Sequence, residues 1–180
     1  MTLEEAKRKI MIELDESGET SALENIGDYR AKLPDIFNTV IKELAMFCKP
    51  VVKTTDITIE NGYCIKPKDC YVVNGIYKNK TRIVFDILGN RIMADDGEYT
   101  MVYEALPDNI DDNTSDDYEF EIDADCQEAM IHGVCAQICI NDEPTLYQIY
   151  FERYNLAIAN INDKLNKTSK LSFTGGVDLW

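Results

Sequence analysis

The clearest structural signal in the chain lies in residues 125–165, which read DCQEAMIHGVCAQICINDEPTLYQIYFERYNLAIANINDKL. Nine of the twelve residues from Ala129 to Ile140 are apolar, which is typical of a helix that is buried on several sides. After a turn at residues 141–144, a second apolar stripe follows at helical spacing: Tyr147, Tyr150, Tyr154, Ala157, Ile158, Ile161 and Leu165. The short connection predicts an antiparallel helical hairpin. We expect its core to bury Met130, Val134, Ile138, Tyr150, Tyr154 and Ile161.

Two further helices are predicted before residue 50. Thr2 and Glu5 have the spacing of a capping box, and the apolar residues that follow predict a helix from about Leu3 to Leu14. A second helix is expected from about Asn25 or Pro34 to Phe47, since proline suits a first helical turn and Lys49-Pro50 ends the pattern. Its predicted apolar stripe is Ile36, Val40, Leu44 and Phe47, with Phe37 and Ile41 beside it.

Between these helical parts, the apolar period changes from about 3.6 residues to about 2. Short segments rich in Val, Ile, Thr and Tyr are separated by turn signals such as Asn61-Gly62 and Asn74-Gly75, which is typical of antiparallel hairpins. The predicted strands lie near 56–59, 70–76, 82–88, 91–94 and 99–104. They indicate a small β-sandwich or barrel. The predicted fold class is therefore α+β: a bundle of about four helices (residues 1–50 and 108–166) with an inserted antiparallel β-module (residues 51–107).

Residues 167–180 lack apolar periodicity and are expected to form an extended C-terminal tail. Phe173, Val177, Leu179 and Trp180 surround the Gly175-Gly176 pair, which allows a tight turn against a surface. Large apolar side chains on such a tail commonly dock on a partner. We therefore expect a partner-binding anchor made of Phe173, Gly175, Gly176, Val177, Leu179 and Trp180. The alternative is a tail that folds back on the domain's own core.

The charge of the chain restricts its partners. The formal net charge is -15, and residues 108–125 contain nine acids and no lysine or arginine. Affinity for nucleic acid depends on lysine and arginine contacts with phosphate, so specific DNA or RNA binding is not expected. The acidic stretch does not fit a calcium-binding EF-hand, because Asp116 and Ile122 stand where glycine and glutamate are needed. A solvated loop or wall is the better interpretation.

Motifs for catalysis or cofactor binding are missing. The sequence has one histidine and no GxSxG, HExxH, GxxxxGK[ST] or GxGxxG pattern. Cys135 and Cys139 with His132 would align three soft ligands on a helix, but there is no CxxC pair, and a cysteine commonly acts as a small buried apolar residue. His132 itself is expected to be a satisfied core residue. We expect a non-enzymatic protein without metal or cofactor; a two-carboxylate hydrolase remains the enzymatic alternative.

The predicted localisation depends on two features that the sequence lacks. No stretch approaches the roughly 20 apolar residues that span a bilayer, and the start, Met1–Glu5, lacks the features of a signal peptide. The chain is expected in the cytosol, with no membrane partner.

Four stretches of the sequence carry a resemblance to a known family. They are Asp125–Ala129, Asp142–Asn155, Asp28–Asn38 and Gly97–Pro107. The shared pattern is an acid–Cys–Gln/Glu–Ala start, an apolar helix, an acid–Pro turn and a helix that contains Arg-Tyr-Asn. Together they resemble the head–tail connector proteins of tailed bacteriophages, also called adaptor or head-completion proteins. The resemblance extends over roughly residues 3–165 and includes no catalytic motif.

The resemblance implies a structural protein of the virion neck that is assembled in the host cytoplasm. Connector proteins form a ring, usually of twelve copies, beneath the portal, and contact the portal partly through C-terminal tails. The implied partners are the portal protein, other copies of the chain, the next neck or tail protein, and genomic DNA that passes through the lumen without specific binding. Two alternatives stay open: another neck or tail component, such as a stopper or tail-completion protein, and a protein whose β-module binds a ligand or host factor.

Overall fold

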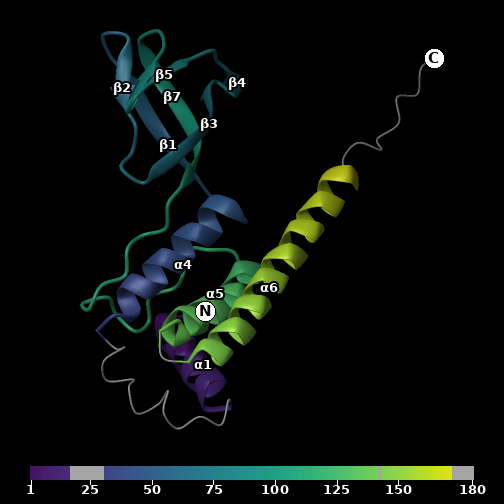
Figure 1. Cartoon of the computed structure of the whole chain (residues 1–180). Coiled ribbons are helices and arrows are strands. Elements are labelled where there is room, and N and C mark those ends of the chain that lie inside the picture. The colour runs from purple at the N-terminus through teal and green to yellow at the C-terminus, as the bar shows by residue number, and fades with distance from the viewer. Residues whose placement is uncertain (17–30, 142, 172–180) are drawn as a thin grey trace, which may run out of the picture. The chain divides into compact units, whose positions relative to one another are not determined.

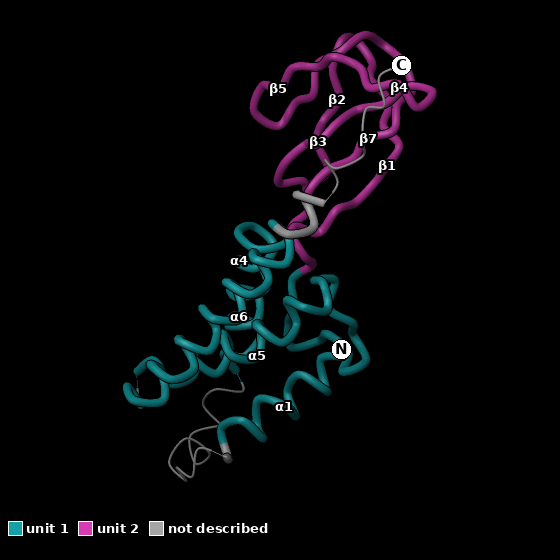
Figure 2. Tube along the Cα trace, turned by 90° about the vertical axis from the view of Figure 1, so that its right-hand side faces the viewer, with its two compact units in different colours: residues 1–49, 109–180 teal, residues 50–108 magenta. Residues whose placement is uncertain are grey.

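The computed structural model describes residues 1–16, 31–141 and 143–171 of the 180-residue chain (Figure 1). Among these residues the protein is α+β, with four helices and antiparallel sheets, which confirms the predicted class at this level. The chain divides into two compact units, a helical unit of residues 1–49 and 109–180 and a β-unit of residues 50–108 (Figure 2). No helix in the described ranges is both long and apolar enough to cross a membrane.

Helix α1 spans Leu3–Glu16 and begins at the predicted capping box. The backbone N–H of Glu5 donates to Thr2 Oγ1 at 3.2 Å, and the backbone N–H of Thr2 donates to Glu5 Oε2 at 3.0 Å. The box therefore satisfies N–H groups that a helix start leaves without partners. One face of the helix is buried through Leu3, Ala6, Ile10 and Leu14.

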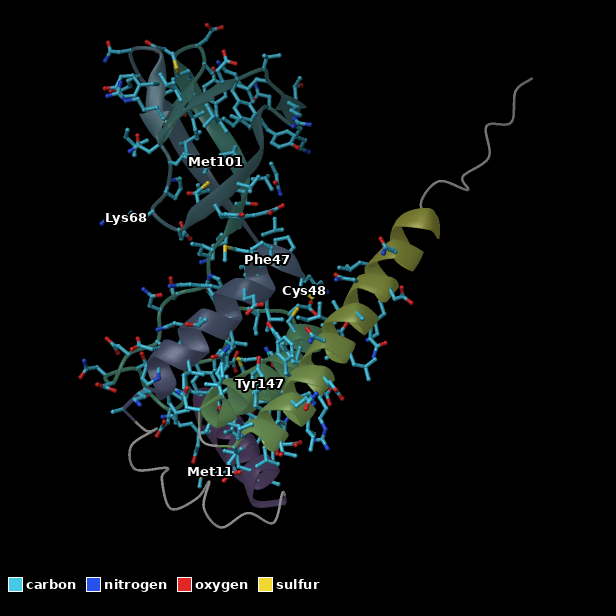
Figure 3. All side chains as sticks on the ribbon, in the orientation of Figure 1. Met11, Phe47, Cys48, Lys68, Met101 and Tyr147 are labelled. Carbon is cyan, nitrogen blue, oxygen red and sulfur yellow. The ribbon has the colours of Figure 1, made fainter. Side chains whose placement is uncertain are left out.

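Helix α4 spans Leu33–Phe47 and has Pro34 in its first turn. The alternative start near Asn25 falls outside the described residues. The predicted stripe is only partly right, because Phe47 is 71% exposed at the end of the helix (Figure 3). At about 100° per residue, Ile36 and Phe47 fall at the edge of the buried face. That face is made by Phe37, Val40, Ile41, Leu44 and Ala45.

Helices α5 (Ala124–Cys139) and α6 (Pro144–Leu171) lie side by side as the predicted antiparallel hairpin (Figure 1). Asp123 caps α5, and its carboxylate accepts the backbone N–H of Asp125 at 3.0 Å. The six residues predicted to form the hairpin core are all buried, and none is more than 4% exposed. The prediction of this core is confirmed.

Gly133 of α5 faces side chains of both α4 and α6. A Cβ atom at this position would stand 2.9 Å from Val40 Cγ1 on α4 and 3.0 Å from Tyr154 Cε2 on α6. The absence of a side chain therefore lets both neighbouring helices pack against the same turn of α5.

The extended tail predicted for residues 167–180 was placed too early. Helix α6 continues to Leu171, although Lys167–Lys170 carries no apolar stripe. This stretch also contains no glycine or proline, so nothing in it ends a helix, and lysines interact favourably with the dipole at a helix C-terminus. A missing apolar stripe therefore does not by itself predict the end of a helix. Residues 172–180 lie outside the described ranges.

The β-unit consists of two antiparallel sheets. The four-stranded sheet has the order β1 (Val51–Ile59), β7 (Gly97–Ala105), β3 (Cys70–Lys78) and β4 (Thr81–Arg82). The three-stranded sheet has the order β2 (Tyr63–Ile65), β6 (Arg91–Met93) and β5 (Asp86–Leu88). Strand β1 pairs with β7 along its whole length, from Val51↔Ala105 to Ile59↔Gly97.

One hydrophobic core fills the β-unit, and both sheets contribute to it. Met101 of β7 is fully buried (Figure 3). The other buried members are Ile59, Ile76, Ile92, Tyr99, Tyr103 and Ala105. The alternation of β7, with odd-numbered residues buried, is the period-2 pattern that the sequence indicated.

Two strand predictions need correction. The predicted strand at 82–88 is two strands, β4 and β5. The backbone N–H of Ile83 still donates to the carbonyl of Ile76 at 2.9 Å, but residues 83–85 belong to neither strand, and the side chains of Ile83 and Phe85 pack against the core. Strand β1 begins at Val51 and not near Asp56. Strand β2 was not predicted. It follows the turn at Asn61-Gly62, where both residues have positive φ angles of 55° and 81°.

Candidate functional site

The six predicted anchor residues, Phe173, Gly175, Gly176, Val177, Leu179 and Trp180, lie outside the described residues. The structure therefore brings none of them into a site. The candidate functional features among the described residues are the acidic segment, the cysteines with His132, and four hollows or faces on the surface.

The acidic segment lies against the start of α1. The backbone N–H of Leu3 donates to the carbonyl of Tyr118 at 2.9 Å, and that of Glu4 donates to the carbonyl of Asp116 at 3.0 Å. Lys7 Nζ also pairs with Asp116 Oδ1 at 2.8 Å. Two of these three contacts are made by the backbone of the segment, so they do not use its carboxylates.

The carboxylates of this segment are only partly neutralised. Lys49 Nζ lies 2.7 Å from Asp123 Oδ2 and holds the pKa of that carboxyl below its usual range. Hydrogen bonds from Thr114 and Asn113 lower the pKa of Asp111. By contrast, the exposed side chains of Asp112, Asp117 and Glu119 form no ion pair with any described residue. The segment is thus an anchored loop with negative charge turned to solvent, as predicted.

The cysteines are placed as packing residues. Cys48, Cys126, Cys135 and Cys139 are buried, and Cys64 and Cys70 are half-buried. Burial raises the pKa of Cys126 to about 12 and also raises that of Cys135. A buried, protonated thiol is neither the nucleophilic nor the metal-binding form. In the described ranges, no group of three or more His, Cys, Asp or Glu side chains could hold a metal ion.

His132 differs from the satisfied core residue that was expected. It is half-buried on α5, and its buried Nδ1 has no hydrogen-bond partner among the residues that the structure describes. The side chain lines a polar hollow of about 570 Å³ between α5 and α6, together with charged residues such as Asp125, Arg153 and Lys164. The burial prediction was too simple because position 132 faces the edge of the helix pair.

An apolar groove of about 420 Å³ crosses the helical unit. Helix α1 and the first turn of α4 form its walls, and the acidic segment forms its rim. The lining residues are Leu3, Lys7, Ile10, Met11, Leu14, Leu33, Pro34, Phe37, Ile110, Asp111, Asp112, Thr114 and Ile138. The groove could accept apolar side chains, but it offers few polar groups to orient a substrate.

The β-unit has a hollow of about 480 Å³ near the ends of β1, β3 and β7. A ligand-binding β-module would need an open aromatic surface here. Tyr99 is only 6% exposed, its hydroxyl donates to the carbonyl of Asp95 at 2.8 Å, and Lys78 Nζ lies 5.2 Å from its ring centroid. The hollow therefore offers a ligand little more than the half-buried ring of Tyr77.

No protein-family model and no curated protein sequence matches the chain. The functional argument therefore depends on the geometry and charge of the residues themselves.

Sequence reasoning missed one surface, the outer face of the three-stranded sheet. Cross-strand pairs place Tyr63 opposite Met93 and Ile65 opposite Arg91, and β5 adds Asp86 and Leu88 beside them. The alternate residues Cys64 and Ile92 contact the core. We call this surface the β2–β6–β5 face: Tyr63, Ile65, Asp86, Leu88, Arg91 and Met93. The pairing of strands almost thirty residues apart defines it, so no local sequence signal could reveal it.

Proposed function

We propose that the chain is a structural protein of the neck of a tailed bacteriophage. In this proposal, copies form a ring that joins the portal to the tail and lines the DNA exit channel. The four helices form the connector-type bundle, and the two sheets form a small sandwich inserted into it. The C-terminal tail attaches the ring to the portal or to an adjacent subunit.

The uneven distribution of charge carries this proposal. Residues 50–108 contain seven basic and nine acidic side chains, a net charge of -2, so the rest of the chain carries -13 of the total of -15. Part of this charge lies on the anchored loop that leaves Asp112, Asp117 and Glu119 in solvent. A negatively charged wall repels DNA and lets it pass without sticking.

The chemistry of the described residues also supports a structural role. The pKa shifts of Asp111 and Asp123 are downward, whereas a general acid needs an upward shift to hold its proton near neutral pH. The thiols of Cys126 and Cys135 are shifted toward the unreactive protonated form.

The proposal is tested by mixing the purified chain with the portal protein of the same phage genome. Electron microscopy and native mass spectrometry should find a closed ring of the chain on the portal, with a fixed number of copies. A chain that leaves portal rings bare under all assembly conditions would contradict the proposal. A ring that binds the tail side of another neck protein, and not the portal, would favour the stopper or tail-completion alternative.

A second experiment tests the role of the charge. The full chain should not shift duplex DNA in a gel at about 0.1 M salt, where counterion-driven binding is still strong. The triple variant Asp112→Lys, Asp117→Lys and Glu119→Lys should gain DNA binding and still attach to the portal, while particles that contain it should eject DNA more slowly. Tight DNA binding by the unaltered chain would refute the channel role.

A further inference from the structure

We propose that the β2–β6–β5 face is the receptor surface for the C-terminal tail of a second copy of the chain. This inference rests on the proposed function, because it names the contact that links neighbouring subunits of the ring. It commits to residues 177–180, Val-Asp-Leu-Trp, as the bound segment.

The composition of the face is that of an interaction surface. Leu88 is 67% exposed, Ile65 is 54% exposed, and Met93 and Tyr63 are 42% and 39% exposed. Isolated exposed apolar residues are ordinary. These four, however, are neighbours on one face of the sheet, where they occupy four of the six outward positions of the paired strands. Tyr, Met and Arg are the residues that protein interfaces favour, and all three occur here.

Arg91 gives the face a chemical preference. Its guanidinium carbon lies 4.6 Å from the centroid of the Tyr63 ring, a cation–π contact that favours this position of the cation. Arg91 forms no ion pair with any residue of the described ranges. The cross-strand neighbours of Arg91 are Ile65 and Leu88, and an unpaired guanidinium between two apolar side chains suits a carboxylate that is itself flanked by apolar groups.

The C-terminal segment of the chain has this chemistry. Asp178 stands between Val177 and Leu179, and Trp180 follows. Nine residues, 172–180, continue beyond the last described residue of α6, which is enough for an extended segment of about 30 Å. Such a segment can place Asp178 at Arg91 and its apolar neighbours on Ile65, Leu88 or Met93.

A second copy is the occupant because a tail bound to its own chain would leave no link between subunits. The test distinguishes the two cases. The full-length chain is prepared with the photoreactive residue p-benzoylphenylalanine in place of Trp180, as an equal mixture of 15N-labelled and unlabelled protein. It is illuminated alone at high concentration and in the presence of portal rings, and the cross-linked peptides are identified by mass spectrometry.

Cross-links from position 180 should map to residues 63–65 or 86–93, and about half of the linked peptide pairs should combine labelled with unlabelled peptides. Pairs that never mix isotopes would mean that the tail binds its own chain. Links to the apolar groove of the helical unit, links only to the portal, or no links in either sample would also overturn the inference. Portal attachment is recorded in the same samples, so attachment without these links refutes only the inference, and the links without attachment refute only the proposed function.

A charge exchange provides the matched control. Arg91→Glu or Asp178→Lys alone should reduce the mixed-isotope cross-links by about tenfold, and the double variant should restore most of them. Arg82→Glu, which changes another exposed arginine of the β-unit outside this face, should leave them unchanged. Equal losses for Arg82→Glu and Arg91→Glu, or no recovery in the double variant, would contradict the proposed pairing.

Discussion

Substitution of Gly133 by alanine tests the packing of the helical unit most directly. In an exposed helix interior, this change stabilises a protein by about 1 kcal/mol, because glycine loses more backbone entropy than alanine. Here the new Cβ would stand 2.9 Å from Val40 Cγ1 and 3.0 Å from Tyr154 Cε2. The valine has a stiff χ1 and the tyrosine ring is rigid, so neither can retreat easily. An overpacking cost of about 3 kcal/mol therefore outweighs the gain.

We expect a net loss of about 1–2 kcal/mol, which corresponds to a melting temperature lower by about 2–8 °C in a chain of this size. Urea unfolding followed by circular dichroism at 222 nm measures the helical unit. Val40→Ala makes room for the new methyl group, so the double variant should be more stable than the sum of the single effects by at least about 1 kcal/mol. A stabilised Gly133→Ala variant, or strictly additive effects, would refute the three-helix contact.

Three further predictions concern pH, thiols and the tail. Burial raises the pKa of Tyr150 to about 12, and tyrosine in an unfolded chain titrates near about 10, so the chain should lose up to about 2 kcal/mol of stability between these pH values. Tyr150→Phe also loses the hydrogen bond to the Glu13 carbonyl, so the variant should be about 1 kcal/mol less stable at neutral pH. Urea titrations should show that it loses less stability than the unaltered chain between neutral pH and pH 12. An equal dependence of stability on alkaline pH in the two proteins would contradict this. A thiol reagent should modify Cys64 and Cys70 first and the four buried cysteines only on unfolding, whereas six equal rates would show that the burial is wrong. Deletion of residues 172–180 should leave the melting temperature nearly unchanged and abolish the assembly of a closed ring on the portal, while failure to fold would mean that the tail belongs to the domain's own core.

The helical hairpin could be predicted because its signal is local. Residues such as Met130, Val134 and Ile138 repeat at the helical period, and the short connection to α6 leaves only an antiparallel return. The capping box at Thr2 and Glu5 is similarly local, and its two hydrogen bonds are present. Propensity and burial agree in these elements, so sequence reasoning succeeded.

The strand boundaries were misplaced because they depend on contacts between distant segments and not on local sequence. Lys53, Thr54 and Thr55 look like a loop, yet they pair with β7 because a strand across the sheet determines their backbone. Residues 83–85 look like a strand, yet they form a connection in which Ile83 and Phe85 pack against the core and Val84 is 93% exposed. Neither outcome can be seen without the partner strand.

The candidate surface was missed for the same reason. Tyr63 and Met93 become neighbours through the register of β2 with β6, and a shift of β2 by one residue would turn Tyr63 toward the core. The prediction of the anchor residues depends on composition alone. A binding experiment with a partner is therefore needed to assign their contacts.

The pairing of Val51 with Ala105 has a consequence for the history and engineering of the chain. The two ends of the β-unit face each other across one ladder rung, with Cα atoms about 5 Å apart. A short turn could bridge that distance, so residues 52–104 could be gained, lost or exchanged for another module in a single genetic event without moving the helices on either side. The helical unit would then serve as a constant frame, and the inserted unit as its variable part.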